Sequence, residues 1–167
     1  MKSALAILLT ILFVAGSAQT GNTAYGTNSL NSVTTGADNS AFGRNALKSD
    51  TTGSNNAAFG ASSMFSNTSG HSNTAVGLQS LYQNTTGYDN ISLGLKSLYS
   101  NTTASKNTAI GNYSLYSNTT GDQNTALGWG SLQQNTDGAN NTAAGYISLL
   151  SNTSGFANTA FGHSALY

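Results

Sequence analysis

The chain is 167 residues long, contains no cysteine, and balances five basic against five acidic side chains, so its formal net charge is zero. These properties exclude a disulfide-stapled domain and leave no basic surface for nucleic acid. The charged residues are also too few for an acidic tract, or for a calcium-binding roll that needs a carboxylate in nearly every turn.

The segment from Met1 to Ala18 has the order of a secretory signal peptide. Lys2 supplies a short positive region, residues 4–15 are apolar except for Thr10, and Gly16-Ser17-Ala18 fits a small-residue cleavage site. The alternative is a membrane anchor, but the apolar run is shorter than the ~20 residues that a span needs. We therefore expect cleavage before Gln19, and a secreted or cell-surface mature chain that does not insert into a membrane.

Residues 19–167 form one repeat domain with a fixed 17-residue period. Counted from an invariant Asn as position 1, the consensus is N-T-A-φ-G-x-x-S-L-x-x-N-T-T-G-x-x, where φ is a mostly large apolar residue. The coils begin at Asn22, Asn39, Asn56, Asn73, Asn90, Asn107, Asn124, Asn141 and Asn158, and the last coil is incomplete. A short period without insertion or deletion predicts an all-β parallel solenoid of nine coils, because two Gly and several turn formers leave no room for a helix pair.

Each coil contains one predicted strand and one predicted turn. Thr-Ala-φ at positions 2–4 suits a strand of three or four residues, which the Gly at position 5 ends. Asn-Thr-Thr-Gly at positions 12–15 is typical of a turn in which the Gly adopts the left-handed conformation.

The invariant Asn at position 1 predicts a side-chain ladder. In coils stacked in register, identical Asn side chains lie ~4.8 Å apart and can hydrogen-bond along the stack. This predicted ladder runs through Asn22, Asn39, Asn56, Asn73, Asn90, Asn107, Asn124, Asn141 and Asn158.

The apolar residues available to each coil are few. They are a residue at position 4, Leu or Met at position 9, and a small residue at position 3. A single stack would have a thin core, so we expect stability to depend on ladder hydrogen bonds and on burial against other chains. A bundle of identical rods is the simplest such assembly.

The repeat unit resembles the head repeats of trimeric autotransporter adhesins, the YadA-like or haemagglutinin-type repeat, most closely at Ser40-Ala41-Phe42-Gly43 and Thr108-Ala109-Ile110-Gly111. The unit here is longer, with the extra residues in the Asn-Thr-Thr-Gly loop. The resemblance implies a left-handed β-roll, a homotrimer, a cell-surface location and adhesion.

Position 10 offers a candidate interaction stripe of four consecutive aromatic residues, Phe65, Tyr82, Tyr99 and Tyr116. In register their rings would lie about 5 Å apart. If this segment is extended, position 9 points into the core and position 10 points outward. The stripe would then form either an interface between chains or a site for sugar or protein ligands.

Other polar residues have simpler explanations than catalysis or modification. His71, Ser72 and Asp89 could form a Ser-His-Asp site, but a polar loop surface explains them better. The sequons at Asn67, Asn84, Asn101, Asn118 and Asn152 fall at the turn position, which explains them without a glycan. The Thr at position 13 suits an internal ladder better than ice binding.

Together these patterns predict a protein without catalytic residues, metal or cofactor. We expect an adhesin head or fibre segment that binds itself, as a homotrimer or an end-to-end fibre, and contacts a host or matrix protein or a carbohydrate. The alternative is a structural fibre, sheath or tail-fibre-like subunit without a specific ligand.

Overall fold

The computed structural model describes residues 20–167, and the predicted signal peptide lies outside them. Each predicted Thr-Ala-φ segment forms a three-residue strand. The strands are β1 (Thr23–Tyr25), β2 (Ser40–Phe42), β3 (Ala57–Phe59), β4 (Thr74–Val76), β5 (Ile91–Leu93), β6 (Thr108–Ile110), β7 (Thr125–Leu127), β8 (Thr142–Ala144) and β9 (Thr159–Phe161). Within the described residues the chain contains no helix.

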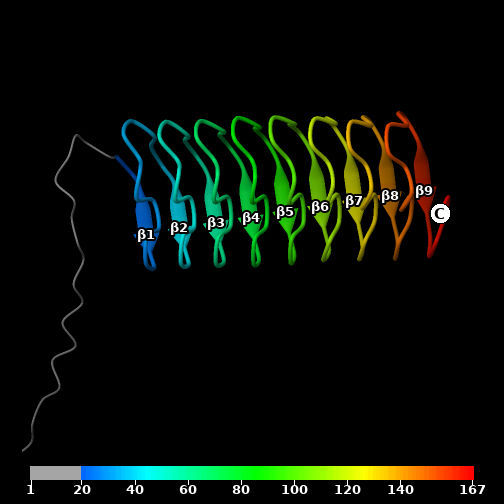
Figure 1. The fold of residues 1–167 in the computed structure, drawn as a ribbon, viewed down its shortest axis with the longest axis horizontal. Helices are drawn as coiled ribbons and strands as arrows, with labels where there is room; N and C mark the ends of the chain where they lie inside the picture. The colour runs from blue at the N-terminus through cyan, green and yellow to red at the C-terminus, as the bar shows by residue number, and fades with distance from the viewer. Residues whose placement is uncertain (1–19) are drawn as a thin grey trace, which may run out of the picture.

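The nine strands form one parallel sheet in chain order, as Figure 1 shows. Each strand pairs with the equivalent strand of the next repeat, so that Thr108 lies beside Thr125 and Ile110 beside Leu127. This arrangement confirms the predicted parallel β-solenoid, with eight complete coils followed by the start of a ninth.

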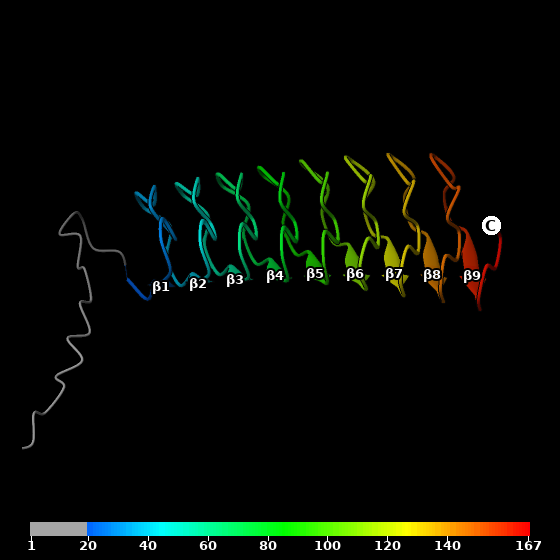
Figure 2. The ribbon, with the colours of Figure 1, turned by 60° about the horizontal axis from the view of Figure 1, so that its bottom comes forward.

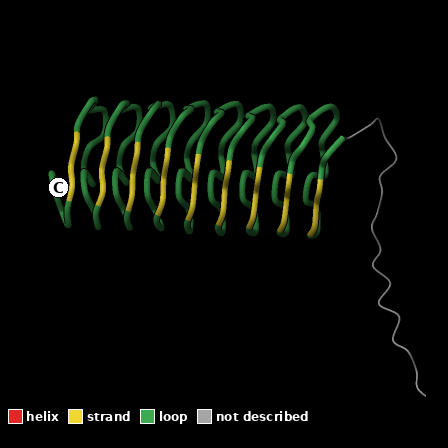
Figure 3. The backbone as a smooth tube through the Cα atoms, turned by 180° about the vertical axis from the view of Figure 1, so that it is seen from behind, coloured by secondary structure: helices red, strands yellow, loops and turns green. Residues whose placement is uncertain are grey.

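The loops of neighbouring coils are hydrogen-bonded as regularly as the strands. Gly43 donates its N–H to the Tyr25 carbonyl at 2.8 Å, Leu47 to Ser63 at 3.1 Å, and Thr51 to Thr68 at 2.9 Å. Figures 2 and 3 show the loops following one another in register along the whole rod. Because loop backbone groups pair with the adjacent coil, the regular structure extends far beyond the three residues of each strand.

The turns use left-handed residues at positions that the sequence did not single out. Positive φ occurs in the residues at positions 7, 9 and 17, for example 51° at Leu81 and 54° at Asp89. The Gly at position 15 does not, so the predicted left-handed Gly of the Asn-Thr-Thr-Gly turn is wrong. At Gly53 a Cβ atom would instead lie 2.5 Å from the Gly70 carbonyl oxygen, so close packing of adjacent coils favours glycine there.

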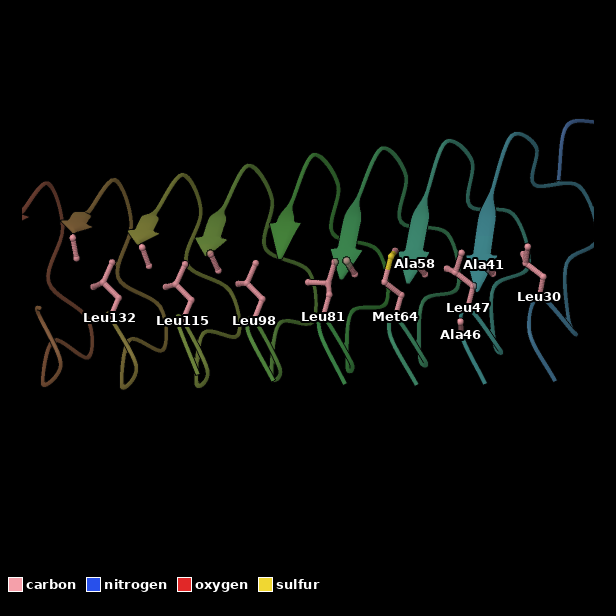
Figure 4. Close-up of a cluster of buried hydrophobic side chains, with 14 of the residues drawn as sticks. Leu30, Ala41, Ala46, Leu47, Ala58, Met64, Leu81, Leu98, Leu115 and Leu132 are labelled. Carbon is pink, nitrogen blue, oxygen red and sulfur yellow. The ribbon is translucent and has the colours of Figure 1, made fainter. Parts of the chain in front are cut away.

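The core consists of two columns that run the length of the rod. Leu or Met at position 9 and a small residue at position 3, usually Ala, face each other across each coil, as Figure 4 shows. Leu81 and Ala75, for example, are both fully buried. Position 4 lies outside this core, because the strand alternates and its middle residue is the one that faces inward.

Candidate functional site: the side-chain columns of the solenoid

The predicted Asn ladder at position 1 is present. At every step the Asn main-chain N–H donates to the Oδ1 of the Asn in the preceding coil, at 2.8 to 3.1 Å. Some side chains also donate to one another, as Asn90 Nδ2 does to Asn73 Oδ1 at 3.1 Å. Asn124 Nδ2 donates to the Gly138 carbonyl at 2.8 Å. This column therefore also binds the turn at position 15 of the same coil.

A second Asn ladder occupies position 12, where the sequence indicated only a turn. Asn84 Nδ2 donates to Asn67 Oδ1 at 2.8 Å and to the Gly87 carbonyl at 3.0 Å. The same pair of bonds recurs at the later members of the column, Asn101, Asn118, Asn135 and Asn152. The sequon asparagines at 67, 84, 101 and 118 are fully buried, so the folded chain cannot present them to a glycosylating enzyme.

Asp50 begins this second ladder in place of an asparagine. Its Oδ1 accepts hydrogen bonds from Gly53 N at 3.1 Å and Asn67 Nδ2 at 3.0 Å, while its buried Oδ2 has no partner. Burial disfavours the carboxylate and raises the pKa of Asp50 from 3.8 to about 6, although the two hydrogen bonds act in the opposite direction. The Asp50 carboxyl group therefore occupies a buried position that holds the neutral side-chain amide of an Asn in the later coils.

Replacing Asp50 by Asn should raise the free energy of unfolding at pH 7 by about 3 kcal/mol, because roughly 1.4 kcal/mol accompanies each unit of the rise in pKa from 3.8 to about 6. A raised folded-state pKa means that wild-type stability from this group is highest below pH 4 and falls as the pH rises towards about 6. Thermal unfolding at pH 4 and pH 7.5 should therefore separate the two proteins only at the higher pH. Asp89→Asn at an exposed position is the control, and equal stability of wild type and Asp50→Asn at pH 7.5 would contradict the prediction.

The Thr column at position 13 forms a ladder of hydrogen bonds between coils, as predicted, but its side chains are not internal. Its side chains are half-buried in the middle coils and exposed towards the ends. From Thr34 to Thr136, each hydroxyl donates to the main-chain carbonyl of the Thr in the next coil, as Thr51 Oγ1 does to Thr68 at 2.8 Å. The hydroxyl hydrogens thus point along the rod, and they do not form a free array for ordering water.

The four rings of the candidate interaction stripe form a continuous stack. Centroids of Phe65 and Tyr82 lie 5.1 Å apart, and those of Tyr82, Tyr99 and Tyr116 follow at 5.2 Å, with planes within 15° of parallel. The spacing is the predicted one, although the segment is a turn and not an extended strand. The rings are half-buried, and their faces are directed towards one another.

The stack continues beyond the predicted residues. Tyr113 lies against Tyr116 at 5.9 Å and against Trp129 at 6.0 Å, which joins position 10 to a second stack at position 6, formed by Trp129, Tyr146 and His163. This extension was not predicted from the sequence because the aromatic residues change column between coils. Lys48 lies over Phe65 at 5.1 Å and Lys96 over Tyr99 at 5.5 Å, so two cations flank the stripe.

The outer face of the sheet carries a partly exposed apolar stripe at position 4. Phe42, Phe59, Val76, Ile110 and Leu127 are each between 37% and 41% exposed, and Tyr25 and Phe161 are 70% exposed. Leu93 and Ala144 complete the column. This run of mostly large apolar side chains exceeds what scattered surface residues explain.

The residues considered for catalysis do not form a triad. His71 stacks on Tyr88 with centroids 5.0 Å apart, and its Nδ1 lies 3.4 Å from Ser72 Oγ. Asp89 reaches the His71 coil only through its main-chain N–H, which donates to the His71 carbonyl at 3.2 Å. Across residues 20–167, no group of three His, Cys, Asp or Glu side chains is placed to hold a metal ion.

These features define a class: a parallel β-solenoid of 17-residue coils with polar ladders inside and apolar columns outside. Comparison of the chain with models of known families, with curated proteins and with solved structures gave no significant match. None of the described segments forms a helix long and apolar enough to cross a bilayer.

Proposed function

We propose that this protein is a non-enzymatic, secreted or cell-surface repeat protein that serves as an adhesin head or fibre segment. The observation that carries the proposal is the apolar stripe, which follows the sheet from Tyr25 to Phe161 and is partly exposed among the described residues. A rod that repeats side chains of similar chemistry every ~4.8 Å presents many similar contacts, which suits assembly and attachment better than it suits the binding of one small molecule.

The assembly covers the apolar stripe with copies of the same chain. Three copies around a common axis, each a left-handed roll, is the arrangement that the resemblance to autotransporter head repeats implies. The aromatic stripe lies beyond the turn at positions 5–8 and stays available for a host or matrix protein or a carbohydrate. The ring faces of this stripe contact one another. The outer ring edges and the Tyr hydroxyls therefore make the contacts with the ligand.

A native mass and an attachment assay on the mature chain test this proposal together. We expect a defined oligomer at micromolar concentration, and beads coated with the protein should adhere to cells or matrix when uncoated beads do not. A monomer without adhesion would overturn the proposal. A defined oligomer without adhesion would identify a structural fibre or sheath subunit instead.

Replacing Tyr82, Tyr99 and Tyr116 together by Ser should abolish attachment and leave the oligomer intact, because the change removes three rings and three hydroxyls outside the apolar stripe. Sedimentation and the bead assay measure the two effects separately. The matched control replaces the same residues by Phe, which keeps the ring stack and removes only the hydroxyls. Loss of the oligomer in the Ser variant would assign the stripe to the interface between chains, and survival of both properties would leave it without either role.

Export should remove the segment from Met1 to Ala18, which lies outside the described part of the chain. N-terminal sequencing of the protein recovered from the cell exterior should begin at or near Gln19, as the order of positive, apolar and small residues predicts. Recovery of exported protein that still begins at Met1 would contradict this prediction.

A further inference from the structure

The charged side chains of the repeat domain are divided between the two turns of the coil. Apart from Lys2 the chain has four cations, and three of them lie in the first turn, at positions 6, 7 and 10: Arg44, Lys96 and Lys48. No Asp or Glu lies at positions 1–11 in any coil. All five carboxylates lie at positions 12–17, and they are Asp38, Asp50, Asp89, Asp122 and Asp137.

Side chains at positions 6, 7 and 10 form one surface, which we call the turn face. Tyr113 at position 7 contacts both Tyr116 at position 10 and Trp129 at position 6, with ring centroids 5.9 and 6.0 Å apart. Arg44 belongs to the same column as Trp129 and is exposed. The three cations of the first turn therefore lie on the surface that carries the aromatic stripe.

Two of these cations are held against the aromatic rings. Lys48 Nζ lies 5.1 Å from the centroid of Phe65, and Lys96 Nζ lies 5.5 Å from the centroid of Tyr99. Both lysines are half-buried. Each ammonium group is thus held in place and partly shielded from water, which strengthens its attraction for an anion.

We infer that the turn face binds a linear polysaccharide that carries uronic acid carboxylates, laid along the rod. This inference rests on the proposed attachment through the aromatic stripe and names its ligand. The carboxylates accept hydrogen bonds from Arg44, Lys48 and Lys96. The sugar hydroxyls bond to the Tyr hydroxyls, which both donate and accept.

The step of the aromatic stripe fits a sugar chain better than a peptide. Ring centroids of Tyr82, Tyr99 and Tyr116 follow one another at 5.2 Å. One hexose of an extended polysaccharide is about as long as this step, so successive sugars meet successive rings. An extended peptide advances roughly 3.3 Å per residue and presents the same side every ~6.7 Å, so its side chains do not keep step with the rings.

The number of cations fits a sparsely charged polymer. Arg44 and Lys48 belong to the second coil and Lys96 to the fifth, which places them about 14 Å apart along the rod. A polysaccharide with a uronic acid at every second sugar carries its carboxylates at intervals of this order. Duplex nucleic acid carries a charge about every 1.7 Å, far more than three cations neutralise.

Calorimetric titration of the mature chain with a hyaluronan oligosaccharide, in which glucuronate alternates with N-acetylglucosamine, tests the inference. An uncharged chitin oligosaccharide of equal length and a glutamate peptide of equal charge are the comparison ligands. Hyaluronan should bind at least tenfold more tightly than either, and added salt should weaken its binding because salt screens the charge contacts.

Replacing Lys48 and Lys96 together by Gln should lower the hyaluronan affinity about tenfold. Replacing both by Arg should preserve it, because the positive charges remain. The matched control is Lys106→Gln, which removes a cation that also lies over a ring, 5.9 Å from the Tyr88 centroid, but at position 17. The control should bind as the wild type does, and thermal unfolding shows whether each variant is folded.

The outcomes separate this inference from the proposed function. Equal affinity for the chitin oligosaccharide would identify a site for neutral sugar, and equal affinity for the glutamate peptide a site for acidic protein. Either result, or unchanged affinity in the folded Gln variant, would overturn the inference and leave attachment standing. Absence of binding to all three ligands would also overturn it, and if coated beads failed to adhere as well, the proposed attachment would fall with it.

Discussion

Replacing Asn107 and Asn124 together by Leu is expected to lower the free energy of unfolding by about 4 kcal/mol or more. The change removes the Oδ1 atoms that accept from the main-chain N–H groups of Asn124 and Asn141 at 2.9 Å. It also removes the Asn124 Nδ2 that satisfies the Gly138 carbonyl. Each buried polar group without a partner costs roughly 1–3 kcal/mol. Urea unfolding followed by circular dichroism measures the loss.

The matched control for the ladder replaces Gln83 and Gln134 by Leu. Both lie exposed at position 11 and have no side-chain hydrogen bond among the described residues. Their replacement should change the unfolding free energy by less than about 1 kcal/mol. If the Asn107/Asn124 variant melted at the wild-type temperature, the ladder would have no part in stability.

Replacing Gly94 by Ala is expected to cost about 3 kcal/mol or more, from backbone strain and overpacking together. Gly94 has a φ of 136°, which side-chain-bearing residues rarely adopt, and a Cβ there would lie 2.6 Å from the Gly111 carbonyl oxygen. Because that oxygen belongs to the next coil, the clash separates two rungs. A shift of the urea midpoint measures the effect.

Gly130→Asn is the control for this position-specific effect. Gly130 lies at position 7 with a φ of 64°, where other coils carry Asn28 and Asn45 at 59° and 61°. Its nearest neighbour is the end of the flexible Gln133 side chain. The control should leave stability within about 1 kcal/mol of wild type. Equal losses at both glycines would show that the crowding around Gly94 is not the cause.

The features that the sequence predicted follow from the period alone. Once equivalent residues of successive repeats are placed side by side, the strand at Thr108–Ile110, the stacked Asn column and the 5.2 Å spacing of Tyr82 and Tyr99 follow from the spacing of parallel strands. No knowledge of the loop path was required. This is why the spacing of the aromatic stripe was predicted correctly although its segment is a turn and not an extended strand.

The features that could not be predicted depend on the path of the loops. Asn84 has the local chemistry of a turn residue, and nothing in Asn-Thr-Thr-Gly shows that its side chain points inward to Asn67. Leu81 adopts a φ of 51°, although bulky residues rarely occupy the left-handed region. The turns that these residues form decide which columns face the core. Without the path of the loops, position 4 could not be separated from the core residues at positions 3 and 9.

The direction of the inter-coil hydrogen bonds has a mechanical consequence. Bonds such as that from the Thr51 N–H to the Thr68 carbonyl run along the rod and join each coil to its immediate neighbours. Tension applied to the two ends would load these bonds in series, so coils would open one at a time and not together. Each opened coil would replace a rise of ~5 Å by about 58 Å of extended chain. A surface protein of this design would lengthen under a sudden pull, and the contacts at its far end would experience less force.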